Sequence, residues 1–218
     1  MIQNNKEMKK IMFNDKYGLT QAVLNGRKTM TRRIITYPSK LRGQNVAGYF
    51  VCRRPSGELV EVCLHDEDER MIDGGQIFPK FQVGEVVAIA QNYRDSGYAP
   101  DSLDRHPKDL SIRGLMKDSA GWNNKMFVKS YACKHHVKIT NVRVERLQDI
   151  SDEDCLQEGV FEWDAGQKDV PFYSFTGADI PDYSNPRDAF EELIDKVSGK
   201  GTWDSNPFVW VYEFKLFD

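Results

Sequence analysis

The sequence predicts an α+β fold with a barrel-like sheet, because its strand candidates are short and are not separated by regular crossover helices. About seven or eight segments have the pattern of a strand, whereas three have the pattern of a helix. A doubly wound parallel sheet would instead require strands and helices to alternate regularly along the chain. The chain has 218 residues, 40% of them hydrophobic, which is enough to build one substantial core. We therefore expect a single domain over residues 1–218.

The N-terminal part of the chain predicts a strand, a short helix, a second strand and a hairpin. Asn25-Gly26 supplies the left-handed residue that commonly ends a helix, and the turn chemistry of residues 53–57 fits a hairpin. Because Cys52 and Cys63 lie at different distances from that turn, we expect them not to face each other. The elements expected are a strand at 11–13, a helix at 17–25, a strand at 29–36, and hairpin strands at 46–52 and 58–64.

The remaining elements are expected to be four strands and two helices, interrupted by two long loops. A break in alternation near Thr140-Asn141 predicts a bulge, Ser151 caps one helix, and Asn185-Pro186 begins the other. Of the aromatic residues in the last strand, we expect Trp210 and Phe214 to lie in the core. The strands are expected at 86–90, 127–133, 137–147 and 208–217, the helices from 151 and 186, and the loop insertions near 92–124 and 160–184.

Charge is distributed unevenly along the chain. The segment 16–57 contains nine Lys or Arg residues and no Asp or Glu, although the net charge of the whole chain is −3. Such asymmetry within one domain indicates a focused positive site for an anionic or electron-rich ligand. The negative net charge disfavours tight, nonspecific binding of long nucleic acid, which depends on many phosphate contacts.

Several classes of protein and site are disfavoured by the sequence. No apolar run approaches the roughly 20 residues needed to cross a bilayer, and the first residues lack the apolar segment of a signal peptide. We therefore expect a cytoplasmic protein with no membrane partner. No Cys-x-x-Cys pair is present, and the adjacent His135 and His136 would face opposite ways on a strand, so we expect no metal and no cofactor.

Several motifs, taken in order, resemble the ASCH domain family, and the last two look especially like its longer members in bacterial genomes and prophages. The resemblance implies a PUA-like fold, which is a bent β-barrel of short mixed strands flanked by a few helices, with a cleft that faces RNA or a nucleobase. The motifs are Gly26-x-Lys28-x-x-Thr31-x-Arg33, Gly84-Glu85, Val144-Glu145-Arg146-Leu147 before a capped helix ending in Glu158-Gly159, and Trp203-Asp204-x-Asn206-Pro207-x-Val209-Trp210-Val211-x-Glu213-Phe214.

The same resemblance implies catalytic roles for Lys28, Thr31 and Glu158, because some small bacterial members of the family hydrolyse N4-acetylcytidine. Amide hydrolysis needs a nucleophile, a base and a group that stabilises the oxyanion. Thr31 would attack the acyl carbon, a partly neutral Lys28 would accept its proton, and Glu158 would either move a proton to the leaving amine or activate water for the second step. This requires Lys28 to lie in the turn before the strand, since residues 28 and 31 point to opposite faces of a flat strand.

Five further residues are predicted to bind the ligand. Arg33 or Arg27 would hold developing negative charge or a phosphate, and Arg32 belongs to the same basic segment. Gln91 and Tyr93 lie in the segment 90–93, where many longer relatives have a charged pair, and the Gln91 amide would read a base edge.

Two functions stay open at this point. The first is a module that binds RNA or a modified nucleotide through a basic cleft, and the second is an amidohydrolase of N4-acylated cytidine-type nucleosides. A plain solvated surface is the alternative for the Lys and Arg residues, and an exposed helix end is the alternative for Glu158.

Overall fold

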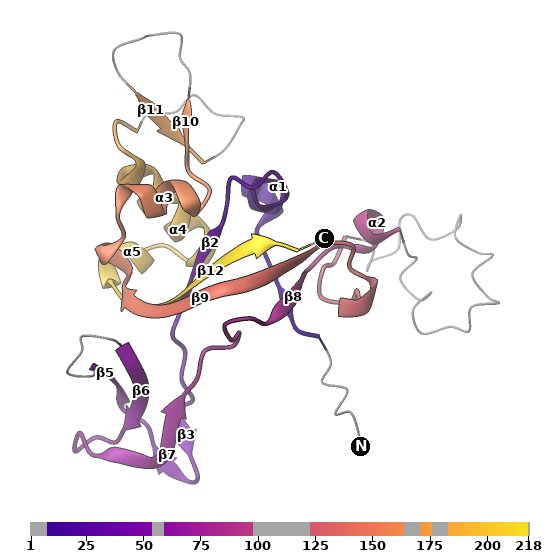
Figure 1. Cartoon of the computed structure of the whole chain (residues 1–218). Coiled ribbons are helices and arrows are strands. Elements are labelled where there is room, and N and C mark those ends of the chain that lie inside the picture. Colours follow the sequence, from indigo (N-terminus) through magenta and orange to yellow (C-terminus); the bar gives the residue numbers. More distant parts are fainter. Residues whose placement is uncertain (1–7, 54–58, 98–122, 164–170, 176–182, 218) are drawn as a thin grey trace, which may run out of the picture.

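The main feature of the fold is a five-stranded sheet, seen in a computed structural model that describes residues 8–53, 59–97, 123–163, 171–175 and 183–217 (Figure 1). The first two strands are parallel, and all other neighbours are antiparallel. In spatial order the strands are β1 (Lys10–Ile11), β8 (Val86–Ile89), β9 (His136–Arg146), β12 (Phe208–Leu216) and β2 (Met30–Ile34).

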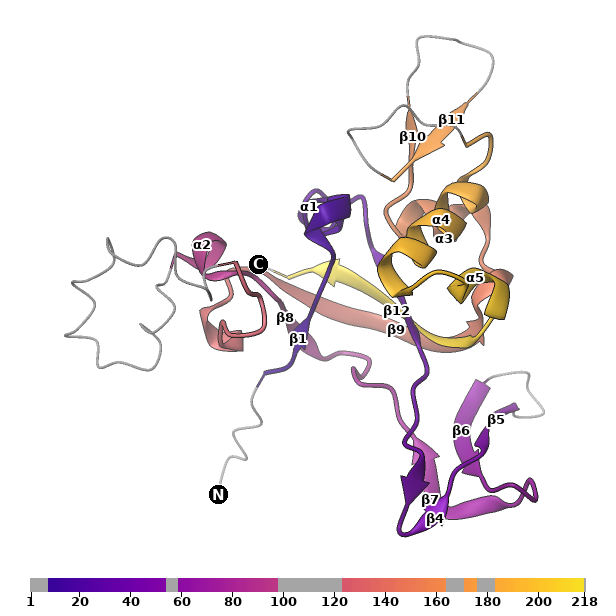
Figure 2. The same cartoon turned by 180° about the vertical axis from the view of Figure 1, so that it is seen from behind.

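A second, antiparallel sheet lies on the side of the main sheet opposite to the larger helices (Figures 1 and 2). Val62, which is fully buried, packs there with Ile35 and Val144 and joins the two sheets. This sheet contains β5 (Gly48–Arg53), β6 (Leu59–His65) and β7 (Met71–Ile77), and two small ladders pair β3 (Lys40–Leu41) with β4 (Gln44–Asn45) and β10 (Phe161–Trp163) with β11 (Phe172–Ser174).

The helices are short except for one. In α4, Asn185 accepts a hydrogen bond from the Asp188 amide, Pro186 occupies the first turn, and an apolar stripe containing Phe190 and Leu193 is buried. Among the described residues, no helix has both the length and the apolar character needed to cross a membrane. The helices are α1 (Leu19–Leu24), α2 (Tyr93–Ser96), α3 (Asp152–Gln157), α4 (Pro186–Ser198) and α5 (Thr202–Ser205), with 3-10 turns at Asp15–Tyr17, Ser130–Ala132 and Leu147–Asp149.

The α+β class and most of the expected elements are confirmed. In the hairpin, Phe50 lies opposite Cys63 while Cys52 lies opposite Glu61, so the two cysteines are not paired across the ladder as expected; their thiols are diagonal neighbours that interact, and both are free. The bulge is also confirmed, because consecutive residues 213 and 214 of β12 pair with residues 141 and 139 of β9 and leave Thr140 as the extra residue.

Other expectations are wrong. The sheets formed by the described residues do not close into the expected barrel. Residues 127–133 do not form the expected strand: their regular structure is a 3-10 turn at Ser130–Ala132, and the carbonyls of Met126 and Val128 accept hydrogen bonds from the Lys10 ammonium instead of from a neighbouring strand. The strand expected at 11–13 is shorter and begins one residue earlier, as β1 at 10–11. The strand β7 was not predicted.

The two predicted loop insertions are described only in part. The first begins with α2, and the second contains β10 and β11 where we expected a loop. Residues 98–122, 164–170 and 176–182 of these insertions lie outside the described residues.

Candidate functional site

The turn before β2 is bound to the C-terminal end of α3. Gly26, at φ +71°, ends α1 and reverses the chain, so residues 27–29 run along the end of the later helix. The last carbonyls of a helix have no partner within it, and cations are favourable at that end. The bonds are Arg27 Nη1 to Gly159 O (2.8 Å), Lys28 Nζ to Glu158 O (2.5 Å) and Thr29 N to Gln157 O (3.0 Å).

Lys28 and Glu158 form a buried ion pair. The Nζ of Lys28 lies 2.6 Å from Oε2 of Glu158, and the two residues are only 2% and 4% exposed. Burial is the main influence on Lys28 and lowers its pKa below the ordinary value, while the charge of Glu158 opposes that effect. The nearby cations Arg33 and Arg32 add to the lowering. Lys28 therefore gives up its proton more readily than a solvated lysine.

Gly159 allows Lys28 to approach α3 this closely. Its φ of +110° is a backbone conformation that other residues rarely adopt. A Cβ built on Gly159 would lie 3.1 Å from Cδ2 of Leu19 and 3.5 Å from Cδ of Lys28. A side chain at position 159 would therefore press on Leu19 of α1 and lie in contact with Lys28.

Arg32 is held by carboxylates from distant parts of the chain. Its side chain is fully buried and donates to Glu158 (Nη1 to Oε1, 3.3 Å), to Asp154 (Nη2 to Oδ2, 2.6 Å) and to Glu145 (Nε to Oε1, 2.9 Å). Burial alone would lower the pKa of Arg32, but Glu158 and Glu145 raise it above the ordinary value. The positive charge of segment 16–57 is thus partly neutralised by acids from residues 145–158.

A cavity of about 290 Å³ lies beside the ion pair, between β2 and α4. Lys28, Thr31, Arg32, Arg33 and Glu158 all line it, together with apolar side chains of α4. Lys28 precedes β2, as the convergence of residues 28 and 31 requires. The structure therefore brings five of the eight predicted site residues into one cavity, and we call it the first cavity.

Thr31 and Arg33 have groups free to meet a ligand in the first cavity. Thr31 is 5% exposed, and none of the described residues hydrogen-bonds its hydroxyl. The guanidinium of Arg33 donates to the carbonyl of Met12, and no described carboxylate lies within 4 Å of it. Burial lowers the pKa of Arg33 from its ordinary value, partly offset by Glu158. Arg33 is thus the cation of this cavity without a carboxylate partner among the described residues.

The other three predicted residues do not line the first cavity. Arg27 is exposed, and its guanidinium lies 4.6 Å from the centre of the Phe161 ring. Gln91 and Tyr93 are buried in a separate part of the fold, where Gln91 Oε1 accepts from the Lys134 amide at 2.5 Å. The hydroxyl of Tyr93 donates to a backbone carbonyl, that of residue 127, at 3.2 Å.

Sequence reasoning missed Glu145 and Asp154, which hold Arg32 in place. Asp154 is one of three consecutive acids in the first turn of the helix capped by Ser151, which is an ordinary place for an acid, and Glu145 enters the sequence analysis only as part of a motif. Within the described residues, no group of three or more His, Cys, Asp or Glu side chains is arranged to hold a metal ion.

Comparison with known proteins gives no family assignment. The chain matches no protein-family model, no curated protein and no solved structure. The resemblance to ASCH domains therefore stays a prediction from motifs, and the function has to be argued from the site itself.

Proposed function

We propose that the protein binds a modified nucleobase, carried by a nucleotide or by RNA, in the first cavity and hydrolyses an exocyclic amide on that base. The observation that carries the proposal is the buried Lys28–Glu158 pair in the same cavity as the unpartnered Thr31 hydroxyl. A nucleophile, a base of lowered pKa and a cation are the parts that amide hydrolysis needs. The α+β class agrees with the PUA-like fold that the motif resemblance implies, whereas the described sheets do not close into the barrel of that fold.

In this proposal the reaction has two steps. The Oγ1 of Thr31 attacks the acyl carbon and passes its proton to a neutral Lys28, while Arg33 stabilises the oxyanion. Collapse of the tetrahedral intermediate breaks the C–N bond, and the leaving amine takes the proton from Lys28. Water, deprotonated by the same base, then attacks the acyl carbon; the bond from that carbon to Thr31 Oγ1 breaks, Lys28 returns the proton to Oγ1, and the acyl group leaves as a carboxylic acid. Glu158 positions Lys28 and, with burial, sets its pKa.

Size and charge favour a small ligand. A volume of about 290 Å³ suits a nucleobase with its acyl group and does not suit a helical nucleic acid. Because Arg32 and Lys28 are paired with carboxylates, the cavity offers a single cation, Arg33, to an anionic group. We therefore expect one phosphate contact at most within this cavity.

Binding without hydrolysis is the second candidate, and one observation favours it. The Lys28 ammonium donates to both the carbonyl and the carboxylate of Glu158, at 2.5 and 2.6 Å. A lysine engaged in this way is a poor base as long as both bonds persist.

The test is release of free cytidine from N4-acetylcytidine, and of the corresponding deacylated products from related acylated nucleosides and their nucleotides. Thr31→Val keeps the side-chain shape and removes the hydroxyl, so we expect kcat to fall at least about 100-fold. Thr29→Val is the matched control, because Thr29 lies in the same segment but does not line the cavity. Full turnover by Thr31→Val would contradict the role of Thr31 as the nucleophile. Binding of these compounds by the wild type without any turnover would leave the second candidate.

A further inference from the structure

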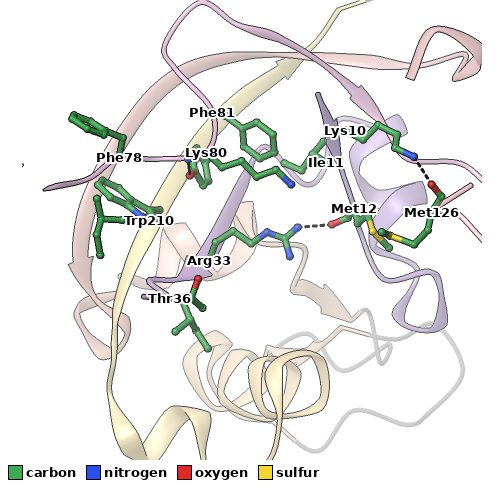
Figure 3. A pocket seen from close by; sticks show the side chains of 13 residues that line it. Lys10, Ile11, Met12, Arg33, Thr36, Phe78, Lys80, Phe81, Met126 and Trp210 are labelled. Atoms are coloured by element: carbon green, nitrogen blue, oxygen red, sulfur yellow. Dashed lines mark hydrogen bonds between the residues drawn. The ribbon is translucent and has the colours of Figure 1, made fainter. Parts of the chain in front are cut away.

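A second cavity, of about 480 Å³, adjoins the first (Figure 3). Met12, Arg33 and Ile34 line both cavities, so these residues form the wall between them. The hydrogen bond from Arg33 to the Met12 carbonyl lies in this wall (Figure 3). A ligand that reaches from one cavity to the other therefore passes the guanidinium of Arg33.

The second cavity is positively charged. Its described lining residues include Lys10, Arg33 and Lys80 and no Asp or Glu. Figure 3 shows the charged ends of Lys80 and Arg33 directed into the same space, while the Lys10 ammonium points away and binds the Met126 carbonyl.

The backbone of Lys80 is fixed, and its side chain has no acidic partner. Its amide donates to the Tyr212 hydroxyl at 2.9 Å, and its carbonyl accepts from Lys9 Nζ at 2.5 Å. The Lys80 ammonium lies 5.4 Å from the centre of the Phe81 ring, with no described carboxylate within 4 Å. This ammonium is therefore free to bind an anionic group of a ligand.

Two aromatic rings complete the second cavity. The side chain of Phe78 is 69% exposed, and Trp210, which we expected in the core, is only partly buried and lines the cavity. Trp210 lies directly opposite Arg33 across the β12–β2 ladder, so ring and cation stand on the same face of the sheet. Exposed rings beside cations form the usual surface for stacking single-stranded bases.

We infer that the second cavity binds the nucleotide next to the target base, with its phosphate between Arg33 and Lys80 and its base against Phe78 and Trp210. In a dinucleotide the phosphate lies between the two bases, as Arg33 lies between the two cavities. The inference rests on the proposed function and narrows it: the preferred ligand is a base within a single strand of RNA, not a free nucleoside.

The test measures binding of two probes by fluorescence titration: a dinucleotide of cytidine and 2-aminopurine riboside, in both linkage orders, and 2-aminopurine riboside alone. The wild type should bind the dinucleotide at least about tenfold more tightly, with quenching of 2-aminopurine by stacking. Phe78→Ser and Lys80→Gln should each reduce this preference about tenfold. Val83→Ser and Lys215→Gln are matched controls, because both residues are exposed and outside the cavity, and they should keep the preference.

The outcomes separate this inference from the proposed function. Equal binding of the two probes, or a preference that survives both cavity substitutions, would overturn the second subsite even if acylated nucleosides are hydrolysed. A preference that depends on Phe78 and Lys80 supports the subsite even if no acylated compound is ever hydrolysed, and in that case only the proposed chemistry fails.

Discussion

Replacing Glu158 by Gln keeps the shape of the side chain and removes the negative charge beside Lys28. The amide oxygen can still accept a hydrogen bond, whereas the ammonium, 2% exposed, loses its only close anion among the described residues. Arg32 loses only one of its three carboxylate partners, because Glu145 and Asp154 remain bound to it. The substitution therefore tests mainly the charge of the Lys28–Glu158 pair.

The loss of stability has an upper limit, because Lys28 can release its proton instead of remaining an unpaired buried cation. From the ordinary pKa of 10.5, removing that proton at pH 7 costs about 5 kcal/mol. Breaking a buried pair by removing one partner usually costs about 3–5 kcal/mol. We expect Glu158→Gln to lower the free energy of unfolding by about 3–5 kcal/mol at pH 7.

This loss should become smaller as the pH rises. In the variant the folded pKa of Lys28 is far below the unfolded value of 10.5, so within that window the unfolded chain binds more protons. Stability then increases with pH, by up to about 1.4 kcal/mol per unit. In the wild type, Glu158 opposes the effect of burial, so Lys28 keeps its proton to higher pH. The free energy of unfolding of the wild type therefore rises less with pH than that of the variant.

The assay is urea unfolding of both proteins at about pH 7 and about pH 9.5. Glu162→Gln, at an exposed position a few residues along the chain, is the matched control and should change stability little. The double variant Lys28→Met/Glu158→Gln should recover much of the loss and show no such dependence on pH. A loss in Glu158→Gln that is the same at both pH values would refute the assignment of a charged, buried Lys28.

Two further predictions concern packing near the site. Gly159→Ala should lower the free energy of unfolding more than Gly199→Ala does, by about 1–3 kcal/mol. Both glycines have positive φ, but only at position 159 would the added Cβ come too close to a neighbour. Urea unfolding measures both losses, and equal losses would exclude the clash. Burial raises the pKa of Cys155 to about 12, so iodoacetamide at about pH 8 should modify the partly exposed Cys52 well before Cys155. Mass spectrometry gives both rates, and equal rates would contradict the burial of Cys155.

The features that the sequence predicted well depend on neighbouring residues. Ser151 and Asn185 are helix caps recognisable from the next few positions, and each accepts the expected amide bond. The bulge at Thr140 follows from a local break in alternation. The placement of Lys28 before β2 follows from Gly26, which ends α1 just ahead of it.

The features that the sequence did not predict depend on distant partners. Arg32 and Glu145 are 113 residues apart, and nothing local to either indicates the other. Residues 127–133 contain good strand formers, but they pack against Ala88 of β8 through side chains and pair with no described strand, so tertiary context overrides propensity. Gln91 and Tyr93 were predicted at the site because of the segment in which they lie. In the structure both side chains hydrogen-bond to backbone groups in a separate packed cluster.

The position of β12 within the sheet has a consequence for the order of assembly. β2, which carries Thr31 and Arg33, is paired with β12 alone among the described strands, and β12 follows all of them in the chain. On the ribosome, β2 therefore waits unpaired until residues 208–216 emerge. Contacts between residues so far apart form slowly. The β2 wall of the first cavity is thus fixed late, when the last strand takes its place between β9 and β2.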